Sequence, residues 1–152
     1  MVAARAERRR VGGGPGRRDE GLAIVETTIA LLLLLVLFLG IMEYGWLFYA
    51  MQIVSNAARE GVREAILPDA TDASVDAVVD DFLGRSGLVG ADAAVEVRAD
   101  DASAVVENVF VTVPVSVTVR IPYADVSILN TGLFPMPAEL RATATMTKEG
   151  PT

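Results

Sequence analysis

Few side chains in this sequence are suited to chemistry of their own. The chain has no histidine and no cysteine. It therefore lacks the usual general base, the Ser-His-Asp and Cys-His arrangements, and the usual nitrogen and sulfur ligands of zinc. The charged groups with the most informative positions are Glu26 and Glu43, which bracket an apolar run. We expect no enzymatic activity, no cofactor and no metal site, and we expect that any chemistry here is done to the chain by another protein.

Glu26 follows Gly21 by five positions and lies at the start of the apolar run. A charge inside a membrane-spanning helix costs about 2.5–3.5 kcal/mol on insertion scales and usually marks a function. If a peptidase cut after Gly21, Leu22 would carry a new α-amino group one helical turn from the Glu26 carboxylate. That carboxylate could pair with its own amine or with the amine of a neighbouring subunit. The spacing predicts a processing site of Gly21, Leu22 and Glu26; the alternative is an edge carboxylate with no role.

The element that must position both carboxylates is a long apolar helix. Residues 27–42 include no ionisable side chain, and Glu26 and Glu43 are 17 positions apart. In a helix this separation is roughly 26 Å, close to the ~30 Å thickness of a bilayer core. Aromatic residues follow Glu43, as is typical of a membrane–water boundary (Trp46, Phe48 and Tyr49). Five consecutive leucines leave no polar face, which disfavours a buried core helix of a soluble protein.

Charge and composition predict the organisation of the chain. Residues 1–20 carry a net charge of +3 and the remainder carries −10. An excess of arginine before the first membrane helix predicts a cytoplasmic N-terminus, an extracytoplasmic C-terminal domain and a single-pass protein of the cell membrane. The acidic outer part argues against nucleic-acid binding. We expect a basic leader at 1–21 that is cleaved and is disordered over residues 1–20, a helix at 22–66, and an outer domain at 67–152. Secretory and twin-arginine signals fit less well, because the apolar run is longer and more hydrophobic than they need.

Three motifs in order carry a resemblance to a known family. They are Val25-Glu26 ahead of the apolar run, Glu43-Tyr44-Gly45 at its end, and the run Asn-Ala-Ala-Arg-Glu-Gly-Val-Arg at residues 56–63. With Gly21 and the basic leader, this segment resembles the TadE-like pseudopilins of tight-adherence (Tad, or Flp) type IV pilus systems. The family commonly has a proline within the apolar run, whereas this chain has none there, so we expect no proline kink.

The resemblance implies a pseudopilin that takes part in pilus assembly and thus in adhesion. It implies processing by a prepilin peptidase, and contacts with other pilins or pseudopilins and with the proteins of the assembly platform. The alternative is an uncleaved, single-pass anchor whose outer domain binds something else. The mass of the mature N-terminus would distinguish these two possibilities.

Small residues follow one stripe of the helix beyond the membrane. Ala58, Gly61 and Ala65 recur at helical spacing after Val54, and small residues let helix backbones approach closely. One hypothesis is that this stripe, with the Glu43-Tyr44-Gly45 motif, packs against neighbouring subunits. The other is that it packs on the chain's own outer domain. The sequence does not decide between them, and both can hold along one helix.

The outer domain has an α+β pattern. Thr71 or Asp72 can cap a second helix whose apolar positions recur at helical spacing from Val75 to Leu83 and which ends at Gly84 and Gly87. Its acidic row is spaced one carboxylate per turn, which suits a solvated face better than a calcium site (Asp72, Asp76 and Asp80).

Three strands are predicted by alternation at 94–100, 109–121 and 140–147, with a turn at 100–103. Pro114 suggests that the middle strand is an edge strand or has a bulge. The economical fold is pilin-like: a three-stranded antiparallel sheet with both helices on its apolar face. The apolar loop at 122–137 is either tucked under the domain, which we favour, or presented to a partner subunit.

Overall fold

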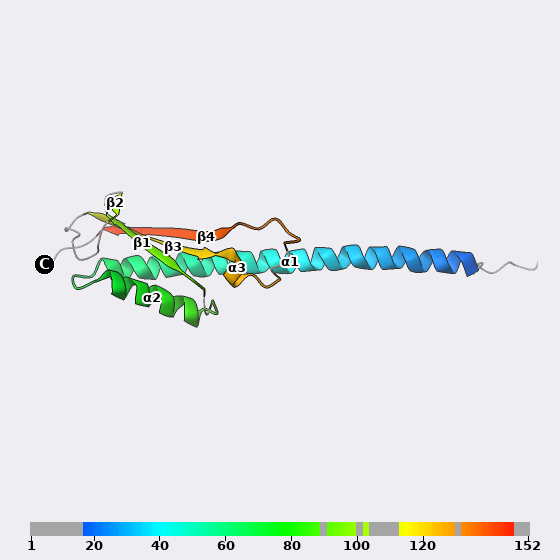
Figure 1. Ribbon diagram of the computed structural model, residues 1–152, viewed down its shortest axis with the longest axis horizontal. Coiled ribbons are helices and arrows are strands. Elements are labelled where there is room, and N and C mark those ends of the chain that lie inside the picture. The colour runs from blue at the N-terminus through cyan, green and yellow to red at the C-terminus, as the bar shows by residue number, and fades with distance from the viewer. Residues whose placement is uncertain (1–16, 89–90, 100–101, 104–112, 130–131, 148–152) are drawn as a thin grey trace, which may run out of the picture. The chain divides into compact units, whose positions relative to one another are not determined.

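The computed structural model describes residues 17–88, 91–99, 102–103, 113–129 and 132–147. The predicted leader therefore lies mostly outside the described residues, as do positions 109–112 of the predicted middle strand. The chain divides into two units, residues 1–39 and 40–152. Figure 1 labels the elements of the described residues, which are the helices α1 (Arg17–Ala65), α2 (Asp72–Arg85) and α3 (Tyr123–Val126) and the strands β1 (Ala94–Ala99), β2 (Ala102–Ser103), β3 (Pro114–Pro122) and β4 (Glu139–Thr147). The fold is α+β, as the sequence predicts.

Helix α1 extends from Arg17 to Ala65 without a break, in keeping with the absence of proline from its apolar run. It begins five residues before the predicted start at 22. Residues 17–20 are therefore helical, although we expected disorder through residue 20. Gly16 is the last of a Gly- and Pro-rich stretch, and only after it does the sequence favour helix. At the other end the helix stops three residues before Pro68, which disfavours helix at the preceding position.

In the first unit, the apolar side chains of α1 are exposed all round the helix. Every large hydrophobic residue described between Leu22 and Phe38 is exposed, from 37% at Val36 to 69% at Leu22. Two threonines in this segment donate their hydroxyls to main-chain carbonyls one turn earlier, Thr27 to Ala23 and Thr28 to Ile24, each at 2.8 Å. Their polar groups are thus paired within the helix. A surface of this kind requires hydrocarbon or other apolar helices around it.

Helix α2 extends from Asp72 to Arg85 and is capped as predicted. The Thr71 hydroxyl accepts the Ser74 N–H at 3.0 Å, while the Ser74 hydroxyl accepts the Thr71 N–H at 3.1 Å. This capping box satisfies amides that the first helical turn leaves without a partner. Asp76 and Asp80 of the acidic row are exposed, and Asp72 is half-buried. Partial desolvation, together with the nearby charges of Asp80 and Asp72, raises the pKa of the Asp76 carboxyl.

The sheet has the order β2-β1-β3-β4 and all of its pairs are antiparallel. The three predicted strands are present as β1 (Ala94–Ala99), β3 (Pro114–Pro122) and β4 (Glu139–Thr147). The fourth strand, β2, is the short segment Ala102–Ser103, which we expected to belong to a turn; it pairs with β1.

Pro114 does not mark an edge strand, because β3 lies between β1 and β4. It is the first residue of β3, a position that proline tolerates.

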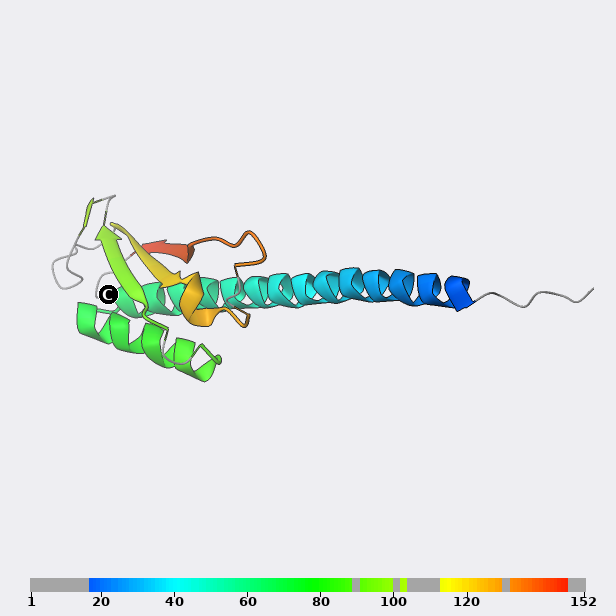
Figure 2. The same ribbon diagram turned by 45° about the vertical axis from the view of Figure 1, so that its right-hand side comes forward.

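The core of the second unit lies where α1, α2 and the sheet meet (Figures 1 and 2). Alternate residues of β3 supply the sheet side and are all fully buried (Val115, Val117, Val119 and Ile121). Gly61 of α1 is the point of closest approach: a Cβ added there would lie 2.9 Å from Val79 of α2 and 3.1 Å from Val117 of β3. Glycine at this position thus lets the two helices and the sheet pack together.

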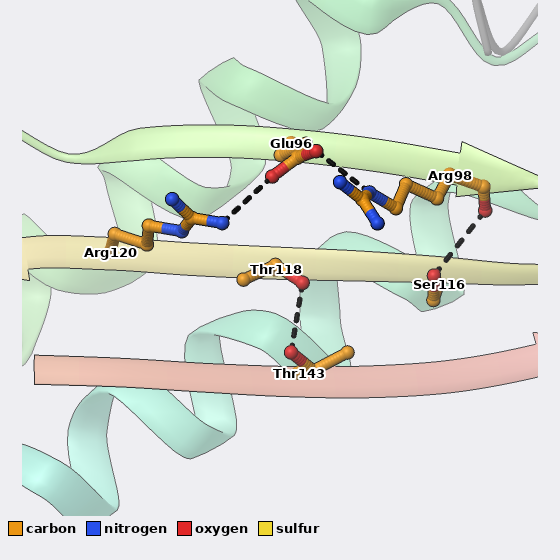
Figure 3. A network of polar contacts seen from close by, with 6 residues as sticks. All are labelled: Glu96, Arg98, Ser116, Thr118, Arg120 and Thr143. Atoms are coloured by element: carbon orange, nitrogen blue, oxygen red, sulfur yellow. Dashed lines mark hydrogen bonds and ion pairs between the residues drawn. The ribbon is translucent and has the colours of Figure 1, made fainter. Parts of the chain in front are cut away.

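The opposite face of the sheet is polar (Figure 3). Glu96 of β1 accepts hydrogen bonds from Arg98 at 2.7 Å and from Arg120 of β3 at 3.0 Å. The hydrogen bond from Arg98, with the charges of the nearby arginines, lowers the pKa of the Glu96 carboxyl. The hydroxyls of Thr118 and Thr143 are 2.8 Å apart on adjacent strands. One face of the sheet therefore builds the core, and the other carries hydrogen-bonded polar side chains.

Candidate functional site

Glu43 is the one buried charged residue among the described positions, with only 3% of its surface exposed. Its carboxylate accepts three hydrogen bonds. The hydroxyls of Tyr123 and Ser127 both donate to Oε1 at 2.7 Å, and the main-chain N–H of Leu129 donates to Oε2 at 3.2 Å. We call these four residues the Glu43 site. A buried charge normally requires this degree of hydrogen bonding to be tolerated.

A single helical turn places both hydroxyls at the carboxylate. Helix α3 spans Tyr123–Val126, and the Ser127 N–H closes the turn on the Tyr123 carbonyl at 2.9 Å. Side chains four positions apart lie on the same face of such a turn, so Tyr123 and Ser127 point the same way. The Tyr123 N–H is bonded to the carbonyl of Ala138 at 3.0 Å, which joins the start of α3 to the approach to β4.

The residues that flank Glu43 on α1 hold the rest of the same loop. We call the described residues 123–129 and 132–137 the boundary loop. The Tyr44 hydroxyl donates to the carbonyl of Pro135 at 3.2 Å, and the Tyr44 ring meets Phe134 edge-on with centroids 6.5 Å apart. The Trp46 indole N–H donates to the carbonyl of Val126. The segment Glu43-Tyr44-Gly45-Trp46 is therefore a docking surface for the boundary loop.

Glycine leaves room for an aromatic ring one turn before Glu43. A Cβ added at Gly40 would lie 3.0 Å from the ring of Phe134, which is closer than ordinary van der Waals contact. The absence of a side chain at Gly40 lets the Phe134 ring lie against the helix backbone.

The Glu43 carboxylate changes the chemistry of its tyrosine partner. Burial, together with the hydrogen bond to Glu43 and its negative charge, raises the pKa of Tyr123 to about 12. The phenol therefore remains a proton donor to Glu43 throughout the physiological range. The arrangement is a structural hydrogen-bond network.

The predicted processing residues lie in the first unit. Gly21, Leu22 and Glu26 are all in α1 and all exposed. A Cβ added at Gly21 would meet no atom within 4 Å. Glu26 makes no hydrogen bond or ion pair with the side chains that the structure describes. The three residues are thus accessible to another protein, and their role as a processing site stays a prediction.

The predicted helix-packing residues divide into two groups. Ala58, Gly61 and Ala65 are buried in the chain's own core, so on this face the structure shows the intramolecular packing that the sequence left open. Tyr44 and Gly45 are exposed, and a Cβ at Gly45 would meet no atom within 4 Å. Glu43 is committed to the boundary loop. Packing against other subunits remains a prediction for the exposed part of this set.

Sequence reasoning missed the partners of Glu43. Tyr123 and Ser127 were part of an apolar loop without assigned roles, because a single helical turn has no detectable hydrophobic period. One signal was present: an acidic residue at the end of an apolar helix requires a donor, and Tyr123 and Ser127 are hydroxyl side chains four positions apart in that loop.

The fold and the site together define the class: an α+β protein whose N-terminal helix is long and apolar enough to cross a membrane. Residues 21–63 match the model of a family described as TadE-like protein, which confirms the resemblance stated from the sequence for this segment. The match begins at Gly21 and includes Glu26 and the Glu43-Tyr44-Gly45 motif. Searches of curated proteins and of solved structures gave no match.

Proposed function

We propose that this chain is a pseudopilin-like component of a Tad (Flp) type IV pilus assembly system. In this proposal a prepilin peptidase cuts between Gly21 and Leu22, and the mature chain remains in the cell membrane through its apolar helix. The leader is cytoplasmic and the α+β unit lies outside the membrane. The chain performs no catalysis; other pilins or pseudopilins and the assembly platform are its partners.

The observation that carries the proposal is the TadE-like match that begins at Gly21 and continues into an exposed apolar helix. This helix has no apolar covering from the described residues of its own unit, so lipid or other helices must supply it. Cleavage after Gly21 would place an α-amino group one turn from Glu26. The Glu26 carboxylate, which has no partner among the described residues, would then pair with this amine. The pairing would offset the cost of holding a charge at the membrane edge.

Substitution at Gly21 tests the processing step. Gly21→Arg adds a bulky charge where the structure has open space, so we expect the folded outer unit and membrane insertion to be unchanged while trimming is lost. Gly84→Arg is the matched control: it adds the same charge at a helical glycine of α2 that also faces open space. Co-expression with a prepilin peptidase, read by the mobility and mass of the product, should show a trimmed control and an untrimmed Gly21 variant. Normal trimming of Gly21→Arg would contradict the assigned site.

A further inference from the structure

The boundary loop presents large apolar side chains to its surroundings. Ile128 is 48% exposed and Leu133 is 58% exposed. Among the described large hydrophobic residues after α1, only these two and Leu67 are exposed to this degree. Gly132, with a φ of 66°, lies directly before Leu133 in a backbone conformation that glycine adopts readily, so the chain turns sharply just before this side chain.

Hydrogen bonds fix the boundary loop at one level of α1. Leu129, next to Ile128, is bonded to Glu43, and Phe134, next to Leu133, lies against Gly40. Gly40 is inside the apolar run, about 4.5 Å along the helix from Glu43 on the membrane side. In Figures 1 and 2 the loop drawn in orange before β4 extends farther along α1, in the direction of the helix N-terminus, than any strand does. The loop therefore lies where the membrane-spanning part of the helix ends.

The exposed side chains of α1 at this level are also apolar. Ile41 and Met42 of α1, directly after Gly40, are also exposed. Residues 122–138 include no lysine and no arginine, so attraction to anionic headgroups cannot be what holds the loop at a bilayer. Asp125 and Glu139 are exposed in or next to the loop and require water. A loop with exposed apolar side chains and with acidic residues in it or next to it suits the interfacial zone of a membrane.

We propose that the boundary loop is a second membrane contact, in which Ile128 and Leu133 insert into the interfacial zone of the bilayer beside α1. The occupant of this apolar surface is lipid. Segments of this type bury their apolar side chains about 5–10 Å into the boundary between headgroups and acyl chains. Because the Glu43 site joins the loop to the helix, insertion would set the outer unit at a defined depth and orientation on the membrane. The inference requires the membrane helix, but not a role in pilus assembly.

Single-cysteine labelling tests this contact directly. The chain has no native cysteine, so Ile128→Cys and Leu133→Cys each give one labelling site for an environment-sensitive fluorophore. The full chain is reconstituted at one copy per phosphatidylcholine nanodisc. Quenching is measured with aqueous iodide and with lipids that carry a spin label near the headgroup. Leu37→Cys, in the apolar run, is the membrane control, and Thr145→Cys, exposed on β4, is the aqueous control.

We expect labels at 128 and 133 to be quenched by iodide several-fold less than the label at 145, and to be quenched by the shallow spin-labelled lipid. Iodide quenching equal to that at 145 would overturn the proposal. Protection that appears only with several copies per disc would also overturn it, because the occupant would then be a second copy. Protection that requires anionic lipid would contradict an apolar contact, since we expect the same protection with and without phosphatidylglycerol.

Discussion

Removing the charge of Glu43 should loosen the boundary loop from helix α1. Glu43→Gln keeps the shape of the side chain, but the two hydroxyl bonds lose their charge assistance and an amide N–H₂ group faces the N–H of Leu129. Hydrogen bonds to charged groups contribute about 1.5–3 kcal/mol and neutral ones about 0.5–1.5 kcal/mol. Two weakened bonds and one unsatisfied donor therefore cost several kcal/mol. Relief of the carboxylate's desolvation offsets part of this, which leaves a net destabilisation of about 2–3 kcal/mol.

Urea unfolding of the full chain in detergent micelles measures this cost. Trp46 is the only tryptophan of the chain, and its indole is bonded to Val126 next to the Glu43 site, so its fluorescence reports on this region. Tyr123→Phe removes one charge-assisted bond and should cost about 1.5–3 kcal/mol, whereas Tyr44→Phe removes an exposed neutral bond and should cost less than about 1 kcal/mol.

A double-mutant cycle tests whether Glu43 and Tyr123 stabilise the protein through one shared interaction. Glu43→Gln and Tyr123→Phe should be non-additive by about 1 kcal/mol or more, because they remove parts of one interaction. If Glu43→Gln alone costs less than about 0.5 kcal/mol, as is usual for surface substitutions, the carboxylate is not the anchor of the boundary loop and this reasoning is refuted.

Three further predictions concern packing, capping and titration. Gly61→Ala should destabilise the second unit by about 1 kcal/mol in urea unfolding, because overpacking (about 1–3 kcal/mol) exceeds the gain in helix propensity. Gly84→Ala, which faces open space in α2, should instead stabilise it by up to about 1 kcal/mol. Thr71→Ala removes the acceptor for the Ser74 N–H and should cost about 1 kcal/mol in the same assay. Because the pKa of Tyr123 is raised from 10.0 to about 12, its contribution to stability is fully present below pH 10 and is lost as the pH rises through 12. The difference in absorbance at 295 nm between the native chain and Tyr123→Phe should follow this titration.

Each of these predictions has a contradicting outcome. Stabilisation by Gly61→Ala would mean that α1 and the sheet do not meet at this residue. An unchanged midpoint for Thr71→Ala would show that the capping box contributes nothing to the stability of α2. A difference titration centred near pH 10 would mean that Tyr123 is neither buried nor bonded to Glu43.

The sequence alone predicts the elements with a clear hydrophobic period. The run of leucines defines the apolar helix, the positions from Val75 to Leu83 define α2, and the alternation of valines defines β3. These patterns are direct consequences of which face each element buries, so no tertiary information is needed to find them.

The sequence could not predict what depends on tertiary contacts. Pro114 suggested an edge strand, but the order of strands is set by pairing on both sides of β3 rather than by one residue. The stripe of Ala58, Gly61 and Ala65 suits any close partner, and only the fold shows that this partner is the chain's own sheet and α2. The Glu43 site joins residues about 80 positions apart, a separation at which local patterns carry no information.

The mass of the mature chain is the most direct test of the proposed function. Protein purified from native membranes and measured intact should begin at Leu22, with the arginine-rich leader absent, and it should co-isolate with pilins or with proteins of the assembly platform. A mass that includes Met1 and the leader, in material that does not co-isolate with any such protein, would contradict the account and leave a single-pass anchored domain.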